Sequence, residues 1–186
     1  MLAAAGAGAG GGVAALLGSC GGEDDNPEVT TTVSPDQARS DAAVTNALLD
    51  LERMAVIAYE VAGARLTGAA RTAARRFRDH EREHQRAMEE AIRGLDAHPV
   101  PARPRVSYTA GFPPLDREQE ALRFVLDVEN TQVAAYGDSL ASIVTPGLRA
   151  TVLSILGAEA EHMSVILGEL HEPQAPRSLV TGNAPT

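Results

Sequence analysis

Apolar residues recur every three to four positions between residues 48 and 66, which is the spacing of one face of an α-helix. The Ser-Pro-Asp-Gln sequence at 34–37 has the features of a helix start, with serine as N-cap, proline at the first position and glutamine three residues after the cap. Thr67-Gly68 interrupts the pattern, and an arginine-rich helix is expected over about 69–95. These positions predict two helices joined by a tight turn.

The second half of the chain repeats this arrangement after a proline-rich connection. Residues 96–115 contain five prolines, so we expect neither a helix nor a central strand there. Asp116 is the expected N-cap of a third helix, and Gln119 completes its capping box. That helix is expected to reach about residue 144, where Thr-Pro-Gly at 145–147 turns the chain into a fourth helix that ends near residue 170.

Two tight hairpins and one long middle connection predict an all-α fold, a four-helix bundle with a long crossover between its second and third helices. A helix of about 27 residues is roughly 40 Å long. The connection at 96–115 could span up to about 66 Å when extended, so it can run the length of the bundle. Composition agrees, because 44% of the residues are hydrophobic and only 3% are aromatic, which favours packed helices over a β-sandwich.

Charge and cysteine content exclude several classes of protein. The formal net charge of −9 argues against a nucleic-acid partner, because binding to nucleic acid needs a basic surface. The single cysteine, Cys20, excludes both an internal disulfide and a metal site built from four cysteines.

Residues 1–20 carry no charged side chain, are rich in Ala and Gly, and end in Leu-Gly-Ser-Cys. They resemble the lipobox of bacterial lipoproteins, in which small residues precede a cysteine that becomes lipidated. The resemblance implies an exported protein, lipid-anchored through Cys20 on the outer face of the cytoplasmic membrane, or secreted. An export signal normally begins with a basic segment, and the first basic residue is Arg39, so a flexible tail with an incidental cysteine stays open. The expected organisation is an export signal at 1–20, a disordered acidic linker at 21–33, the bundle at 34–171 and a flexible tail at 172–186.

An internal repeat carries the candidate chemistry. Residues 49–52 and 126–129 both read Leu-Asp-x-Glu, and in both copies an Ala-Tyr pair ends seven residues after the Glu. Residues 81–84 and 159–162 both read Glu-x-Glu-His. The paired segments lie 77 and 78 positions apart, so the chain consists of two copies of one helical hairpin, each with one Glu and one Glu-x-x-His.

Each Glu-x-x-His can present both side chains to one site, because positions i and i+3 share a face of a helix. The Glu on each partner helix lies at a similar height, so four carboxylates and two imidazoles are expected to converge in the middle of the bundle. Four carboxylates balance the charge of two divalent cations, whereas without metal they would repel one another. The candidate metal ligands are Glu52, Glu81, His84, Glu129, Glu159 and His162.

The order of these residues resembles that of the ferritin-like di-iron/di-manganese carboxylate superfamily, over about residues 36–170. The resemblance implies a ferritin-like bundle with a cofactor of two Fe or two Mn ions. By the family pattern, Glu81 and Glu159 would bridge the two ions, and Glu52 and Glu129 would be terminal ligands.

The same resemblance gives His84 and His162 one metal ion each, bound through a ring nitrogen. Tyr59 and Tyr136 would lie beside the site and are the candidate catalytic residues. Such a site implies a protein that oxidises Fe(II) or consumes peroxide, of the ferroxidase, peroxidase or manganese-catalase type. Its partners would be metal ions and O2 or peroxide, and a homodimer is left open.

Three departures narrow the resemblance. Rubrerythrins carry a further Glu one turn after the third-helix ligand, where this chain has Gln132, and also a four-cysteine iron centre that one cysteine cannot form. Cage-forming ferritins usually have a short fifth helix, for which residues 171–186 are a poor sequence. We therefore expect a ferritin-like domain that handles metal or peroxide outside the membrane.

Two other functions stay open. The sequence at 80–84 is His-Glu-x-x-His, the signature of a zinc protease, with His80 and His84 as ligands and Glu81 as general base. The second copy of the hairpin has Ala158 in place of His80, so the repeat keeps the residues of a di-metal site and not those of a protease. The other alternative is a non-enzymatic helical envelope or stress protein with a structural or empty metal site, so whether the chain is an enzyme is not decided.

Overall fold

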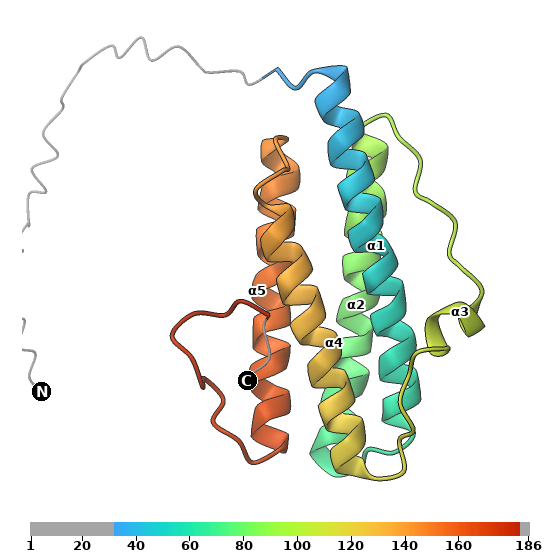
Figure 1. The fold of residues 1–186 in the computed structure, drawn as a ribbon, viewed down its shortest axis with the longest axis vertical. Coiled ribbons are helices and arrows are strands. Elements are labelled where there is room, and N and C mark those ends of the chain that lie inside the picture. Colours follow the sequence, from blue (N-terminus) through green and yellow to red (C-terminus); the bar gives the residue numbers. More distant parts are fainter. Residues whose placement is uncertain (1–31, 183–186) are drawn as a thin grey trace, which may run out of the picture. The chain divides into compact units, whose positions relative to one another are not determined.

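The computed structural model describes residues 32–182, and within that range every regular element is a helix (Figure 1). The helices are α1 (Pro35–Gly63), α2 (Gly68–Gly94), α3 (Arg105–Thr109), α4 (Glu118–Ser139) and α5 (Pro146–Glu169). The four long helices form a bundle with a crossover between α2 and α4, so the predicted fold class is confirmed. Residues 1–31, with the predicted lipidation site Cys20, lie outside the described residues.

The first hairpin follows the predicted signals. Ser34 Oγ accepts the backbone amide of Gln37 at 3.3 Å, and Gln37 Oε1 accepts the amide of Ser34 at 2.9 Å, which completes the expected capping box. Pro35 takes the first helical position. At the expected break, Thr67 is the N-cap of α2, and Gly68 has a positive φ of 49°, a backbone conformation that glycine adopts without strain.

The start of α4 differs by one residue from the prediction that Asp116 caps the helix and Gln119 completes the box. Arg117 is the N-cap residue, and Glu120 Oε2 accepts the backbone amides of Asp116 and Arg117 at 2.9 and 3.0 Å. A carboxylate is a stronger acceptor than a side-chain amide, and it is favoured at the positive end of a helix. Glu120 is therefore preferred over Gln119 as the capping side chain.

The second hairpin turns earlier than predicted. The helix α4 ends at Ser139 and not near residue 144, and Pro146 opens α5 instead of forming the turn. Proline is favoured at the first position of a helix, where its missing amide proton is not needed. The Thr-Pro-Gly sequence at 145–147 is thus a helix start, with Thr145 as N-cap.

Carboxylates of the opposite hairpin cap the two hairpin turns. Thr67, the N-cap of α2, donates its backbone amide to Glu118 Oε1 of α4 at 2.7 Å. Thr145, the N-cap of α5, donates its backbone amide to Asp41 Oδ2 of α1 at 2.9 Å. Asp41 is only 1% exposed, so this second contact belongs to the interior. Each hairpin supplies a group that the other uses at its turn.

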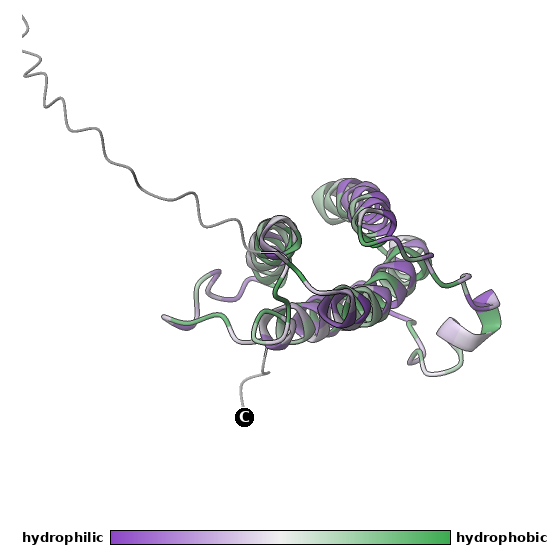
Figure 2. Ribbon diagram, turned by 90° about the horizontal axis from the view of Figure 1, so that it is seen from above, coloured by the Kyte–Doolittle hydropathy of each residue, from purple (hydrophilic) through white to green (hydrophobic). Residues whose placement is uncertain are grey.

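The crossover at 96–115 contains α3, so the prediction of no helix there was wrong. No proline falls within α3, and Pro104 precedes it, where a proline interrupts no helical hydrogen bond. Tyr108 is buried and donates to Asp50 Oδ1 of α1 at 2.7 Å, while Arg103 Nη2 donates to Asp50 Oδ2 at 2.7 Å. These contacts attach the connection to α1. The view from above shows the short helix of the connection outside the four long helices (Figure 2).

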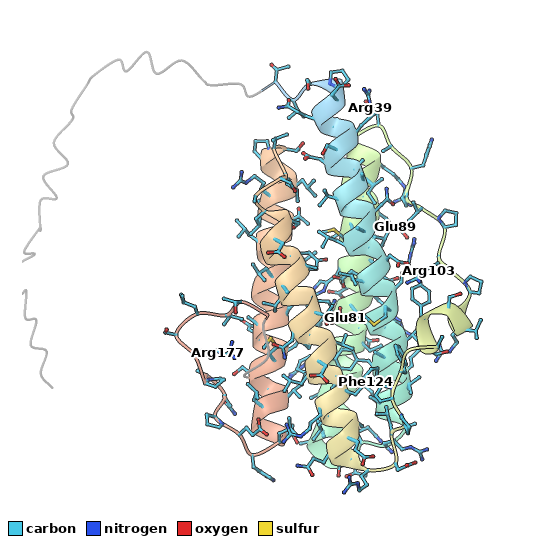
Figure 3. All side chains as sticks on the ribbon, viewed as in Figure 1. Arg39, Glu81, Glu89, Arg103, Phe124 and Arg177 are labelled. Atoms are coloured by element: carbon cyan, nitrogen blue, oxygen red, sulfur yellow. The ribbon has the colours of Figure 1, made fainter. Side chains whose placement is uncertain are left out.

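A polar layer divides the apolar interior into two clusters. One cluster includes Phe77 and Val125 and extends to the α1–α2 turn, and the other includes Leu49 and Met88 near the opposite end. Glu81, which belongs to the polar layer, lies midway along the bundle (Figure 3). The buried charged and amide side chains of this layer are Glu52, Glu81, Glu129, Gln132, Glu159 and His162.

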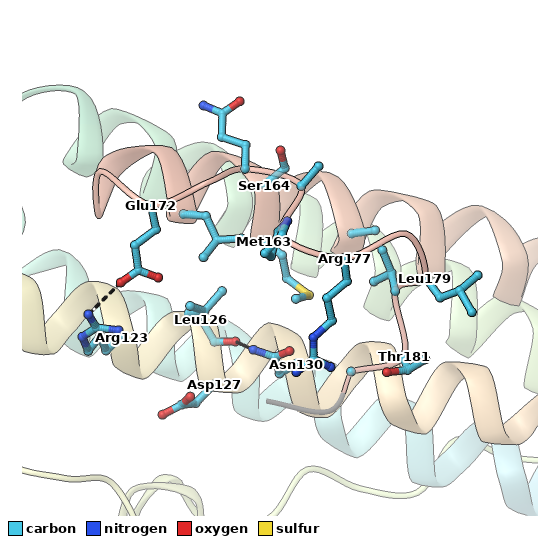
Figure 4. A pocket seen from close by; sticks show the side chains of 17 residues that line it. Arg123, Leu126, Asp127, Asn130, Met163, Ser164, Glu172, Arg177, Leu179 and Thr181 are labelled. Atoms are coloured by element: carbon cyan, nitrogen blue, oxygen red, sulfur yellow. Dashed lines mark hydrogen bonds and ion pairs between the residues drawn. The ribbon is translucent and has the colours of Figure 1, made fainter. Parts of the chain in front are cut away.

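The chain after α5 folds back over α4 and α5 (Figure 4). Glu172 pairs with Arg123 of α4 at 2.7 Å, and the segment closes a cavity of about 480 Å³ whose lining includes Met163 and Leu179. None of the six predicted metal ligands lines this cavity. The flexibility expected of residues 172–186 stays a prediction.

Among the described helices, α5 is long and apolar enough to span a membrane, with a mean hydropathy of 1.3. The same helix carries Glu159 and His162, which are both buried within the bundle. About 33% of its apolar window is buried in the bundle, so packing accounts for part of its hydropathy.

Candidate metal centre

The structure brings the six predicted ligands together in the polar layer. Their side chains form two groups of four, and the ligand atoms of each group lie within 4.8 Å of one another. The first half-site consists of Glu52, Glu81, His84 and Glu159, and the second half-site of Glu81, Glu129, Glu159 and His162. Glu81 and Glu159, the shared glutamates, belong to both half-sites, and Glu52 and Glu129 are the terminal glutamates.

His84 reaches the first half-site from α2, one turn after Glu81. Its Nδ1 lies 3.0 Å from Glu159 Oε1, 3.4 Å from Glu52 Oε2 and 3.6 Å from Glu81 Oε2. The side chain of His84 is 12% exposed, whereas the three carboxylates have no exposed surface. The helical spacing of α2 thus directs one imidazole nitrogen at carboxylates from three helices.

His162 occupies the equivalent place in the second half-site, on α5. Its Nδ1 lies 3.2 Å from Glu159 Oε2, 3.3 Å from Glu81 Oε1 and 3.5 Å from Glu129 Oε1. Its side chain is only 2% exposed, and Phe77 stacks on its ring with centroids 4.1 Å apart. The two half-sites therefore share a geometry, but the second is more deeply buried.

Six buried atoms of the candidate metal ligands have no hydrogen-bond partner in the described part of the chain. They are one oxygen of each glutamate, namely Glu52 Oε2, Glu81 Oε1, Glu129 Oε2 and Glu159 Oε2, and the Nδ1 atoms of His84 and His162. Unpaired buried polar atoms are rare and costly, so six in one place point to a ligand that they share. Carboxylate-rich donors with two imidazoles suit iron or manganese better than copper or zinc, and they fit two divalent ions.

The four carboxyl groups differ in their proton affinity. Burial raises the pKa of Glu52 and Glu129 well above the usual range of a glutamate, and the charge of the shared glutamates raises it further. Burial also acts on Glu81 and Glu159, but their contacts with the two imidazoles outweigh it and lower the pKa of both. Without metal, the surroundings therefore favour the protonated form of the terminal glutamates and the charged form of the shared glutamates.

The imidazoles are held in the charged form. Burial disfavours a charged histidine, but the surrounding carboxylates outweigh it and raise the pKa of His84 to about 12, with Glu159 the largest contributor. In the same way, Glu129 leads the groups that raise the pKa of His162 to about 11. Two positive imidazoles then balance two carboxylates, so the centre is built to hold positive charge.

Two tyrosines connect the terminal glutamates across the hairpins. Tyr59 of α1 donates to Glu129 Oε1 of α4, and Tyr136 of α4 donates to Glu52 Oε1 of α1. Both hydroxyl groups are buried, and burial raises the pKa of both phenols, so they remain donors at neutral pH. Each bond leaves the second oxygen of its glutamate without a hydrogen bond. The predicted catalytic tyrosines thus lie at the centre, each bound to the terminal glutamate of the other hairpin.

Sequence reasoning named Gln132 only as a departure from rubrerythrins, but the structure places it in the centre. It is fully buried on α4, and its Nε2 donates to Glu81 Oε2 at 3.0 Å and lies 3.5 Å from Glu159 Oε1. The available signal was its position three residues after Glu129, which puts it on the same face of the helix. Gln132 therefore supplies a neutral donor to the shared glutamates.

His80 lies beside the second half-site, although it belongs to neither group of ligand atoms. Its Nδ1 is 2.9 Å from Nε2 of His162. The zinc-protease hypothesis needs His80 and His84 on one metal ion, but the ring of His84 faces three carboxylates and that of His80 faces another histidine. The grouping of side chains favours the di-metal ligand set.

Comparisons with known proteins agree with this fold. A family model described as a ferritin-like domain matches residues 40–172. The chain is similar to the crystal structure of ferritin-like, diiron-carboxylate proteins from Bacillus anthracis str. Ames, with a TM-score of 0.57 and 18% sequence identity. That similarity covers 72% of this chain and 97% of the other, and at this identity it shows a common fold. A search of curated proteins found no significant match.

Proposed function

The chain belongs to the ferritin-like domain family, and from this membership we propose that it binds two iron or two manganese ions at the centre of its bundle. The observation that carries the proposal is the set of six buried atoms, four carboxylate oxygens and two imidazole nitrogens, that have no hydrogen-bond partner among the described residues. The description of the similar structure as a diiron-carboxylate protein supports the same kind of site.

In this proposal, the shared glutamates would help to hold both ions, because both belong to both half-sites. Glu52 and His84 complete the ligands of one ion, and Glu129 and His162 those of the other. Four ionised carboxylates neutralise two divalent cations, and both imidazoles bind as neutral groups. Metal binding therefore displaces the protons that the centre holds without metal.

We propose that the activity is oxidation of Fe(II) or consumption of peroxide. A bound pair of iron or manganese ions would supply the electron-transfer chemistry with O2 or peroxide. The chain would supply the surroundings: the two apolar clusters exclude water, and Tyr59 and Tyr136 orient the terminal glutamates. Gln132 fixes the shared glutamates by donating to them.

Metal content tests the proposed site. The chain is loaded anaerobically with Fe(II) or Mn(II), and metal per chain is measured by elemental analysis. We expect two ions per chain, and none in the Glu81→Ala/Glu159→Ala variant, which removes both shared glutamates. The matched control is Glu83→Ala/Glu161→Ala, which removes the exposed glutamates of the same two Glu-x-Glu-His segments and should keep both ions. Full metal content in the Glu81→Ala/Glu159→Ala variant would refute the site.

A second candidate function is a non-enzymatic bundle whose metal is structural or absent. It is favoured by one observation, that two charged imidazoles can balance the shared carboxylates without metal. Turnover separates the two functions. Oxidation of Fe(II) or loss of peroxide above the rate of the Glu81→Ala/Glu159→Ala variant supports an oxidoreductase, whereas stoichiometric binding without turnover supports the structural function.

We also propose that the protein is exported and anchored through a lipid on Cys20. The support is the uncharged, Ala- and Gly-rich sequence of residues 1–20, which ends at the single cysteine of the chain. In a bacterium that lipidates exported proteins, Cys20→Ser should abolish incorporation of a labelled fatty acid and release the protein from the membrane fraction. A Cys20→Ser protein that stayed with the membrane would contradict the proposal.

A further inference from the structure

The second half-site has a neighbour that the first lacks. His80 stands one residue before Glu81 on α2, and the equivalent position before Glu159 on α5 is Ala158. The ring of His80 lies nearly parallel to that of His162, with centroids 5.2 Å apart and 25° between the planes. Its Nδ1 is 2.9 Å from Nε2 of His162, which is hydrogen-bonding distance.

The two nitrogens of His162 face different partners. Nδ1 is the nitrogen near the three carboxylates, at 3.2 to 3.5 Å, so Nε2 is the one directed at His80. A neutral imidazole that offers Nδ1 to a metal carries its proton on Nε2. That proton points at Nδ1 of His80, which can accept it when His80 is in the tautomer protonated at Nε2.

A second contact from the same helix restrains the ring of His162. Phe77 lies one turn before His80 on α2 and stacks on His162, with centroids 4.1 Å apart and 27° between the planes. Phe77 therefore restricts the plane of the His162 imidazole, and His80 restricts the rotation of that ring within its plane. Both act from α2 on a side chain of α5.

His84 has no such support. Among the described residues, neither of its ring nitrogens has a hydrogen-bond partner, and its side chain is 12% exposed compared with 2% for His162. Hydrogen bonds behind a metal-binding histidine fix its tautomer and orientation, and losing one typically costs about 10- to 100-fold in metal affinity. The two half-sites should therefore differ in affinity.

We propose that His80 is a positioning residue for His162, and that it makes the second half-site the tighter of the two metal sites. His80 accepts the hydrogen bond from Nε2–H of His162. This contact holds the Nδ1 lone pair of His162 toward the proposed metal position among the shared and terminal carboxylates. This inference rests on the proposed binding of two metal ions.

The test is an anaerobic titration of the 186-residue chain with Mn(II) alone. Binding is measured by calorimetry and by the electron paramagnetic resonance signal of free Mn(II). We expect two ions bound with unequal affinity, and in His80→Ala a loss of about 10- to 100-fold at the tighter site only. His80→Asn should restore most of the affinity, because its amide oxygen can accept the same proton. His98→Ala, which removes an exposed histidine, is the matched control and should leave both affinities unchanged.

Each result decides a separate point. Two ions bound with the same affinities in the wild-type chain and in His80→Ala would overturn this inference and leave the proposed function standing. A wild-type chain that bound no Mn(II) would overturn both. Failure of His80→Asn to recover affinity, with helical circular dichroism and melting temperature unchanged, would show that packing of the ring matters and not its acceptor atom, and would also overturn the inference.

Discussion

The two hairpins carry the same candidate ligands in different surroundings. Their terminal glutamates, tyrosines and Glu-x-x-His pairs occupy equivalent positions of the repeat. Two other side chains beside the ligands have no counterpart: Gln132 of α4 corresponds to Ala55 of α1, and His80 of α2 corresponds to Ala158 of α5. The repeat thus includes the candidate ligands and the tyrosines but neither Gln132 nor His80, so a difference between the two ions would come from residues that touch neither.

Acidification should have the largest effect on metal affinity, and it should weaken binding at both half-sites alike. The raised pKa values of His84, His162 and the terminal glutamates favour about four bound protons in the metal-free centre, and two ions must displace those protons. Affinity for the pair of ions should therefore fall as pH falls below 7, by up to about four powers of ten per pH unit. A pH-stat titration with Mn(II) should record about two protons released for each ion.

A proton count of zero would contradict the charge balance. The count should be smaller by about one in Glu129→Gln, because a side-chain amide carries no displaceable proton. Glu83→Gln, at an exposed position, is the control and should leave the count unchanged.

Removing one terminal glutamate should abolish metal binding at its own half-site and leave the other half-site able to bind. Glu52→Ala deletes a ligand of the first half-site and Glu129→Ala one of the second, so each variant should retain about one metal ion per chain. The lost affinity should exceed about 100-fold, since loss of a group behind a ligand already costs 10- to 100-fold. Elemental analysis after gel filtration measures the outcome, and loss of both ions from either variant would show that the half-sites are not independent.

The two turn caps should differ in their contribution to stability. Asp41→Ala leaves the backbone amides of Val144 and Thr145 without their buried acceptor, which should cost about 2 kcal/mol in the free energy of unfolding. Glu118→Ala removes the acceptor for Thr67 at the more exposed turn and should cost about 1 kcal/mol or less. Urea denaturation of the metal-free chain measures both values. Equal costs would mean that burial does not distinguish the caps.

The tyrosines should give the smallest effect on metal binding, and each should act through the terminal glutamate of the opposite hairpin. Tyr59→Phe removes the hydrogen bond to Glu129, and Tyr136→Phe removes the one to Glu52. Each should weaken binding of one ion by about 10-fold and leave the other unchanged. Tyr108→Phe, in the crossover, is a control outside the metal centre. A Tyr59→Phe variant that weakened only the first half-site would contradict the crossed pairing seen in the structure.

The bundle and the convergence of the six ligands could be predicted because both follow from spacing along one helix. An i, i+3 pair shares a face wherever the helix lies, and the repeat then places equivalent faces opposite each other. The error at Glu120 was a choice between neighbouring acceptors, and the five-residue α3 depends on the burial of Tyr108 against α1.

The contacts between helices could not be predicted in this way. The sequence pattern does not indicate that Tyr59 donates its hydrogen bond to Glu129 of the other hairpin rather than to Glu52 of its own. Gln132 was named only as a departure from rubrerythrins, and His80 was assigned only to the protease alternative because the repeat has Ala158 in its place. Both nevertheless lie against ligands. Their positions depend on how the faces of α2, α4 and α5 meet, which sequence spacing does not fix.

The crossed contacts have the form of an interface between two identical subunits. In a two-fold dimer, residue i of one copy contacts residue j of the other, and j contacts i in return. The pairs Tyr59–Glu129 and Tyr136–Glu52 obey this rule within one chain, and so do the turn caps Thr67–Glu118 and Thr145–Asp41. The two hairpins of the bundle therefore pack against each other as the subunits of a symmetric dimer do. The crossover joins these two halves covalently into one chain.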